Sequence, residues 1–193
     1  MKDGLVYFII MLTIVNMGCS QQRSFLTEQE RLWNPYKVGQ RLVFGTKGGL
    51  VDTVEITKVL DNQFPDGVGS LQNERLRVFA KVKSGFSSKE RREVIWLNIF
   101  SKSSEYFSRV DFGVTILGGA FWGKMVPFDE LEEYQTIFVE TKYGTYDDVI
   151  RLDDNSGRNL KGTDIKRIYW SKSAGYVKCE TDDETIWELI SIY

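Results

Sequence analysis

Two cysteines and the absence of histidine limit the chemistry open to this 193-residue chain. Without histidine there is no Ser-His-Asp or Cys-His nucleophile, no histidine-ligated zinc or haem, and no imidazole pH switch. Carboxylates, lysine, tyrosine and serine remain for catalysis. The cysteines are Cys19 and Cys179. Cys19 could form a disulfide with Cys179, bind a metal or carry another covalent group.

The residues before Cys19 have the pattern of an export signal. Lys2 and the amino group precede an apolar run from Leu5 to Val15. Crossing a bilayer takes about 20 apolar residues, whereas a signal-peptide core takes about 7–15 behind a positive start. The run therefore predicts a signal peptide that ends at Gly18. A plain signal peptide or short anchor that happens to contain Cys19 is the alternative.

The stretch LTIVNMGC resembles the signal of bacterial lipoproteins, in which a small residue precedes an invariant cysteine. Gly18 and Cys19 match that pattern, whereas Asn16 and Met17 depart from its usual leucine and small residue. The resemblance implies cleavage before Cys19 and a thioether-linked diacylglycerol on its sulfur. Ser20 stands where an aspartate would retain such a protein in the inner membrane, so the resemblance favours the outer membrane of the cell envelope.

A lipid on Cys19 would consume its sulfur and exclude a disulfide with Cys179. Cys179 lies in GYVKCET, where it alternates with Val177 and Thr181. Free cysteine is among the most buried residue types, and no histidine is present to lower its pKa. We expect Cys179 to be an inert, buried side chain.

The charge of the chain excludes a general nucleic-acid binder. The net charge is −2, which is too near neutral for that class. Residues 20–110 hold 15 basic and 10 acidic side chains, whereas residues 111–193 hold 9 and 16. We interpret this asymmetry as complementary halves of one sheet.

Apolar and polar residues alternate from Val38 onward, which predicts strands. The alternation is clearest in residues 75–83 and 109–116. Turn-rich breaks such as GTKGG, KYGT and KSAG separate the strands. We expect an all-β fold, an antiparallel meander of about 9–11 strands that forms a curled sheet, half-barrel or barrel.

Only short helices are expected. Thr27 and Glu30 fit a capping box, and Asn34-Pro35 ends the short helix that follows. Pro127 and the acids after it suit the first turn of a second short helix. The predicted organisation is a signal peptide of residues 1–18, a lipid-anchored tether of residues 19–27 and a single β-rich domain of residues 28–193.

The register of the last hairpin follows from its side chains. If Asp182-Asp183-Glu184 form the loop, Cys179 opposes Trp187 and Lys178 opposes Glu188. A slip of one residue would set apolar residues against charged ones, so the pattern favours the first register.

The ending IYWSKSAGYVKCETDDETIWEL resembles the last strands of small uncharacterised envelope lipoproteins of Gram-negative bacteria. Tyr169, Trp170, Gly175 and Trp187 occupy the recurring positions, and TYDDVIRL resembles the preceding strand. The resemblance implies a packing pattern and no activity.

One strand face is a candidate surface for an anionic glycan, a lipid headgroup or a partner. It consists of Arg75, Arg77, Phe79, Lys81 and Lys83. The alternative is a solvated face whose basic residues discourage edge-to-edge aggregation.

A second candidate set is aromatic. Trp96, Trp122, Trp170 and Trp187 could line an apolar cavity inside a curled sheet. The alternative is an ordinary core, because aromatic residues favour strands in any case.

Carboxylates are grouped at residues 129–133, 147–148 and 182–184. A glycosidase needs two of them about 5–9 Å apart, and adjacent acids in turns usually face water. The run DDNSGRN lacks the spacing of a calcium loop. We therefore expect no catalytic residue, no metal and no cofactor.

The sequence predicts an envelope lipoprotein anchored to a membrane through Cys19. Its expected role is non-catalytic, as a binding or accessory module for an apolar or glycan ligand or a neighbouring envelope protein. A carboxylate-dependent hydrolase and a purely structural spacer are the alternatives.

Overall fold

The structure is a computed structural model that describes residues 24–62, 74–83, 91–102, 106–116, 119–157 and 159–193. Within these residues, eleven strands form one antiparallel sheet and two helices are short. The elements are α2 (Glu28–Arg31), β1 (Arg41–Gly45), β2 (Val51–Asn62), β3 (Arg75–Lys83), β4 (Arg91–Phe100), β5 (Arg109–Ile116), β6 (Gly119–Pro127), α3 (Phe128–Glu133), β7 (Ile137–Glu140), β8 (Thr145–Asp153), β9 (Ile165–Ser171), β10 (Gly175–Thr181) and β11 (Ile186–Ile192).

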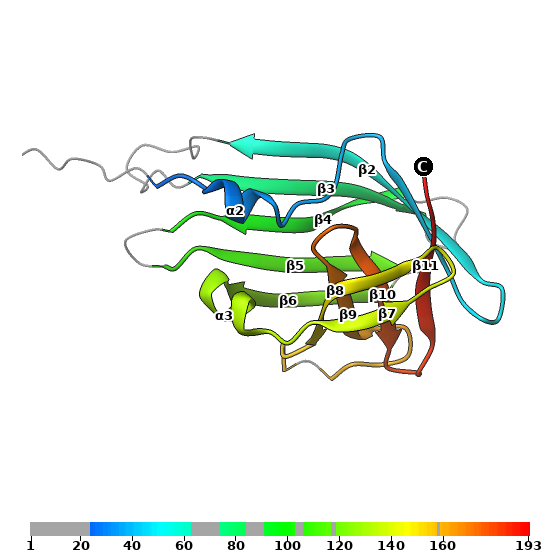
Figure 1. The fold of residues 1–193 in the computed structure, drawn as a ribbon. Coiled ribbons are helices and arrows are strands. Elements are labelled where there is room, and N and C mark those ends of the chain that lie inside the picture. Colours follow the sequence, from blue (N-terminus) through cyan, green and yellow to red (C-terminus); the bar gives the residue numbers. More distant parts are fainter. Residues whose placement is uncertain (1–23, 63–73, 84–90, 103–105, 117–118, 158) are drawn as a thin grey trace, which may run out of the picture.

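The sheet is a meander in which nearly every strand pairs with its neighbours in sequence. The order is β6-β5-β4-β3-β2-β1-β11-β10-β9-β8-β7, so the first and last strands pair and the two edges are β6 and β7. The sheet curls into a half-barrel, and α3 connects its two edge strands at the end of β6 (Figure 1). The predicted all-β, antiparallel architecture is confirmed.

Both short helices form where the sequence predicts them. The Thr27 hydroxyl accepts a hydrogen bond from Glu30 N at 3.2 Å, and Thr27 N donates to the Glu30 carboxylate at 2.7 Å. This capping box satisfies two backbone donors at the start of α2. Helix α3 follows Pro127, with Asp129 and Glu130 in its first turn.

The first described residues are bonded to the sheet. Glu74 N and the Ser101 hydroxyl donate to Ser24 O at 3.1 and 3.0 Å. The buried Glu74 carboxylate accepts a hydrogen bond from the backbone N–H of Leu26, which is itself buried. Residues 24–27, which the sequence assigns to the tether, therefore contact the folded body.

The predicted register of the last hairpin is confirmed. Lys178 pairs with Glu188 and Cys179 with Trp187. The loop is closed by a hydrogen bond from Glu184 N to Thr181 O at 3.1 Å, with Glu184 in a left-handed conformation.

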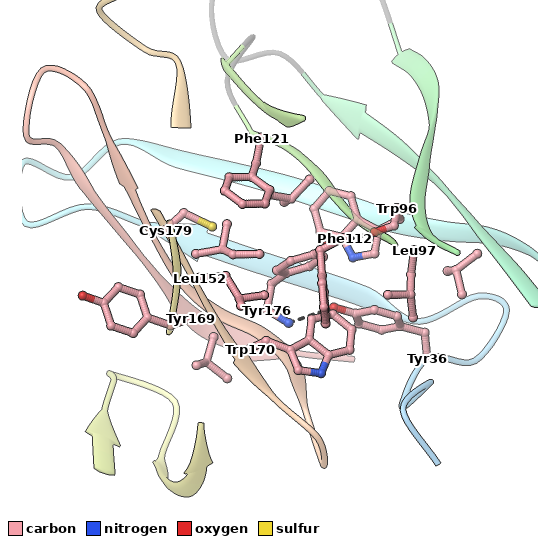
Figure 2. Close-up of a cluster of buried hydrophobic side chains, with 14 of the residues drawn as sticks. Tyr36, Trp96, Leu97, Phe112, Phe121, Leu152, Tyr169, Trp170, Tyr176 and Cys179 are labelled. Atoms are coloured by element: carbon pink, nitrogen blue, oxygen red, sulfur yellow. Dashed lines mark hydrogen bonds between the residues drawn. The ribbon is translucent and has the colours of Figure 1, made fainter. Parts of the chain in front are cut away.

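Large aromatic side chains fill the inside of the half-barrel (Figure 2). Tyr176 of β10 lies between Trp96 of β4 and Trp170 of β9, with ring centroids 5.0 and 4.7 Å apart in edge-to-face geometry. Phe112 of β5 contacts Trp170 at 5.1 Å. Such pairs each contribute about 0.5–1.5 kcal/mol beyond their burial. The cluster therefore joins β4 and β5 to β9 and β10 across the interior.

Gly175 allows Tyr36 to enter this cluster. The Tyr36 hydroxyl accepts a hydrogen bond from Tyr176 N at 2.9 Å (Figure 2). A Cβ on Gly175 would lie 2.1 Å from the same hydroxyl, and Gly175 has φ +81. Only glycine meets both conditions at low cost.

Candidate functional site

The predicted basic face lies on the outside of β3, where exposed and buried residues alternate. At one end of the strand, Lys81 lies between Glu55 of β2 and Glu93 of β4 in register. Lys83 lines the same small pocket as Lys81 and Glu55. Opposite charges on neighbouring strands stabilise each other, so the lysine end of the face is balanced by nearby acids.

The other end of β3 gathers arginines from two strands. Arg75 pairs with Phe100 of β4, which pairs with Arg109 of β5. The guanidinium carbons of both arginines lie near the centre of the Phe100 ring, at 4.2 and 4.4 Å, and Arg77 lies 5.7 Å from the Phe79 ring. Arg75, Arg77, Phe79, Phe100 and Arg109 are termed the arginine patch.

The positive charge of the arginine patch is only partly compensated. Burial lowers the pKa of Arg75, and the charges of Arg77 and Arg109 lower it further, against the opposing effect of Asp111. None of the three arginines is in an ion pair within 4 Å among the described residues. The Nε atoms of Arg77 and Arg109 are buried without a described hydrogen-bond partner. Guanidinium groups so placed suit a phosphate, sulfate or carboxylate.

Asp111 is held in an environment that disfavours its charge. Burial raises the pKa of its carboxyl group, although the Asn98 amide and the guanidinium groups of Arg109 and Arg75 act in the opposite direction. The Asn98 amide donates to the carboxylate at 3.4 Å. Asp111 is the one acidic group described as acting on Arg75, and it offsets the positive charge of the arginine patch only in part.

Beside the arginine patch, β4 and β5 separate. Within the described residues their pairing stops at Leu97 and Phe112. The Tyr176 hydroxyl reaches this point from the inside, 3.1 Å from Trp96 O and 3.0 Å from Gly113 O. It is shared between the two carbonyls as a donor, and so satisfies the backbone where the interstrand bonds end.

A pocket of about 620 Å³ lies where the two strands have separated, and is termed the β4–β5 pocket. Its size is within the range of small-molecule sites. Its wall is mainly apolar, and Asn98 joins it to the arginine patch because Asn98 pairs with Arg77 in register. The lining residues are Arg92, Glu93, Val94, Ile95, Asn98, Asp111, Phe112, Gly113, Val114, Thr115, Phe121 and Ser156.

Three of the four predicted cavity residues lie in the core. Trp96 and Trp170 are fully buried and both contact Tyr176, while the buried Trp187 lies opposite Cys179. None of these tryptophans lines the β4–β5 pocket. The side chain of Trp122 lies outside the described residues, although its backbone pairs with Gly113.

Only one of the two cysteines, Cys179, lies within the described residues. Cys179 is a free, fully buried thiol, and burial raises its pKa strongly, so the prediction of a buried side chain is confirmed. A raised pKa keeps the thiol protonated and unreactive. Cys19, the predicted lipid attachment site, lies outside the described residues.

The predicted carboxylate groups hold turns together. Asp148 accepts hydrogen bonds from the Ser171 hydroxyl at 2.7 Å and from Ser173 N at 2.9 Å. Burial raises the pKa of Asp148, but these hydrogen bonds outweigh it and the pKa lies below its ordinary value. The pKa of Asp183 is lowered first by a hydrogen bond from the Thr181 hydroxyl. These acids serve the β9–β10 and β10–β11 turns.

Comparison of the chain with protein-family models, curated proteins and solved structures found no match. In the described part of the chain, no helix has the length and apolar character needed to cross a membrane. The same residues contain no cluster of three or more side chains suited to hold a metal ion.

The sequence predicted three of the five residues of the arginine patch, Arg75, Arg77 and Phe79, and did not predict the β4–β5 pocket. Phe100 and Arg109 face outward, and the alternation of residues 109–116 already indicated the face of Arg109. Their meeting with Arg75 depends on the register between β4 and β5, across a connection whose turn type the sequence does not specify.

Proposed function

We propose that the chain is a lipid-anchored binding module of the cell envelope, attached to the outer membrane through Cys19. In this proposal the β4–β5 pocket holds the apolar part of a small ligand. The single observation that carries the binding role is the pocket itself, which opens between strands whose pairing has ended.

The pocket has the composition of a ligand site. Ile95, Val114 and Phe121 supply apolar surface from three different strands, and Asn98 and Asp111 supply polar groups. Small-molecule sites combine a mainly apolar lining with a few polar groups that fix orientation. Ile95 is 47% exposed although it is apolar, and a ligand in the pocket would cover it.

The carboxylates around the pocket argue against hydrolysis. Glu93 and Asp111 both line it, but Glu93 is paired with Lys81 and Asp111 lies beside a residue paired with Arg77. Arg77 and Lys81 are four residues apart on β3, which corresponds to about 13 Å along the strand. The two carboxylates are therefore further apart than those of a glycosidase. The Glu93 carboxylate also accepts a hydrogen bond from the Thr57 hydroxyl at 2.7 Å, on the side away from Asp111.

The anchor is tested by metabolic labelling with an alkyne-bearing fatty acid, followed by intact-mass analysis of the purified protein. We expect the label on the wild-type chain, a mature start at residue 19, and loss of the label in Cys19→Ser. Cys179→Ser is the matched control and should keep the label, because that thiol is buried. An unacylated wild-type amino end would contradict the anchor.

The pocket is tested with dansyl-undecanoic acid and a chain that starts at Ser20, which retains every described residue. We expect enhanced dansyl fluorescence with the wild type and a loss of about tenfold or more in affinity with Thr115→Trp, which fills the pocket. Thr145→Trp is the matched control, because Thr145 is an exposed strand residue outside the pocket. Equal binding by both variants would place the probe outside the pocket, and no binding by the wild type would favour the structural spacer.

A further inference from the structure

The path of the chain places the proposed anchor at one end of the sheet. Ser24 is bonded to Glu74 and Ser101, which directly adjoin Arg75 and Phe100 of the arginine patch. Ser24 is five positions after Cys19, and an extended chain spans at most about 18 Å over that length. A lipid on Cys19 therefore keeps this end of the sheet close to the membrane surface.

The opposite end of the sheet is out of reach of such an anchor. β2 runs for 12 residues from Val51 to Asn62, and Asn62 pairs with Arg75. At about 3.3 Å per residue, the β1–β2 turn lies about 36 Å along the strand from the arginine patch. Figure 1 shows the first described residues and the β1–β2 turn at opposite ends of the molecule.

Exposed aromatic side chains are present at the anchor end of the sheet. Phe25, Tyr106 and Phe107 are 56%, 59% and 67% exposed. Arg109 lies 5.0 Å from the Tyr106 ring and hydrogen-bonds Phe107 O at 3.5 Å. Aromatic and arginine side chains together suit the interface between lipid headgroups and acyl chains.

One acidic element lies near the same end and fixes which face is turned to the lipid. Helix α3 carries four carboxylates, and Phe128 N donates to Ser108 O, one residue before Arg109. Anionic headgroups attract the arginines and repel this helix. The favoured orientation therefore has the outer face of β3–β5 toward the membrane and α3 away from it.

Resting on the proposed lipid anchor, we propose that the arginine patch docks on anionic phospholipid headgroups of the same membrane, with Phe25, Tyr106 and Phe107 at the interface. The anchor supplies membrane attachment, and the patch sets the tilt of the half-barrel. The mouth of the β4–β5 pocket, which adjoins the patch through Asn98, then lies close to the lipid surface.

The test uses the acylated full-length product, reconstituted into vesicles of phosphatidylcholine alone or mixed with phosphatidylglycerol. Single cysteines are introduced by Phe107→Cys at the patch, Glu132→Cys on α3 and Lys47→Cys in the β1–β2 turn. Their reaction with a membrane-impermeant maleimide is timed. Cys179 is buried and gives little background.

We expect slow labelling of the Phe107→Cys protein in the phosphatidylglycerol vesicles and fast labelling of the other two. The protection should be lost in phosphatidylcholine alone and at high salt, which screens the attraction. Arg75→Gln and Arg109→Gln should each lower the equilibrium constant for docking about fivefold. Lys81→Gln on the balanced end of β3 is the matched control and should have a smaller effect.

Two results would overturn the inference: equal labelling at all three positions in anionic vesicles, or protection at position 107 that the arginine substitutions leave unchanged. Failure of the anchor gives a different result. An unacylated protein would not float with the vesicles, and Cys19 would itself react with maleimide, which would remove the basis of both proposals.

Discussion

Two regions on the outside of the same sheet carry charged side chains, and the charges are paired in one region and largely unpaired in the other. Over β9 and β10, Glu180 accepts hydrogen bonds from the Tyr169 hydroxyl at 2.6 Å and from Arg167 at 3.0 Å. Arg167 also bonds Asp153 at 2.6 Å. Burial and the hydrogen bond to Glu180 raise the pKa of Tyr169 to about 12. Over β3–β5, by contrast, the arginines of the arginine patch have no described ion pair.

The difference separates a surface that stabilises the fold from one that is available to a ligand. In the Glu180 network, each partly buried charge has partners, so removal of one leaves others unsatisfied. In the arginine patch, like charges crowd one another and the pKa of Arg75 is lowered. Such crowding contributes little to folding, and an anion would relieve it. Mutations in the Glu180 network should therefore change the stability of the fold, whereas mutations in the arginine patch should change binding.

The largest effect is expected at Gly175, which begins β10 in the well-paired region. Gly175→Ala combines a left-handed backbone with a Cβ 2.1 Å from the Tyr36 hydroxyl. We expect a loss of about 2–5 kcal/mol in the free energy of unfolding, measured by urea denaturation. In Gly144→Ala the nearest atom to the new Cβ is 4.0 Å away, so a similar loss there would contradict the argument.

A smaller effect is expected from one carboxylate in each region. Glu180→Gln removes the negative charge and replaces one of the two carboxylate oxygens, which accept from Tyr169 and Arg167, by a donor, and should cost about 1.5–3 kcal/mol. Asp111→Asn removes a charge that burial disfavours, so its unfolding free energy should equal or exceed that of the wild type. Urea denaturation of both variants checks the contrast. A loss for Asp111→Asn as large as that for Glu180→Gln would remove the distinction between the regions.

The two carboxylates should also have opposite pH dependence. Burial raises the pKa of Glu180, but hydrogen bonds and nearby cations outweigh it, so the folded pKa is lowered. Its contribution to stability is therefore present above about pH 4.3, the unfolded value, and is lost as pH falls through the folded pKa. The pKa of Asp111 is raised. Its contribution is present below about pH 3.9 and is lost as pH rises through the folded pKa.

Unfolding free energies measured across the acid range test these signs. As pH rises, Glu180→Gln should become progressively less stable than the wild type. Asp111→Asn should become progressively more stable than the wild type over its own range. Difference curves of the same sign would show that both carboxylates are paired alike.

The smallest effect is expected from the arginine patch itself. Arg109→Gln should change the unfolding free energy by no more than about 0.5 kcal/mol, because its attraction to the Phe100 ring is offset by repulsion from Arg75. Arg167→Gln is the comparison and should cost more, since Arg167 pairs with Asp153 and Glu180. Thermal denaturation of the two variants decides whether the patch contributes to the fold.

Local patterns in the sequence were enough to predict most of the elements. Residues 75–83 and 109–116 form β3 and β5, and their alternating apolar residues are the buried ones. The capping box at Thr27 and the hairpin that pairs Cys179 with Trp187 were also predicted correctly. Each of these depends on residues close together in the chain, where spacing and side-chain type fix the geometry.

The candidate site could be predicted only in part, because it depends on distant residues. Arg75 and Arg77 were identified from their strand, but Arg109 joins them through the pairing of β5 with β4. The β4–β5 pocket exists because that pairing stops at Leu97, and no local pattern marks the stop. Trp96, Trp170 and Trp187, which were proposed as cavity lining, are core residues in the structure, since burial alone does not distinguish the two roles.

The sequence by itself determined a strand-rich chain with short caps, tight turns, an inert Cys179 and no imidazole chemistry, because these follow from composition and near-neighbour spacing. Only the tertiary structure decided that β1 pairs with β11, that Tyr176 bonds the carbonyls of Trp96 and Gly113, and that three arginines meet beside a pocket. The physical reason is that the curl of the sheet brings together groups that are far apart in the chain, such as the backbones of Arg41 and Tyr193, and their pairing is settled by packing across the whole core.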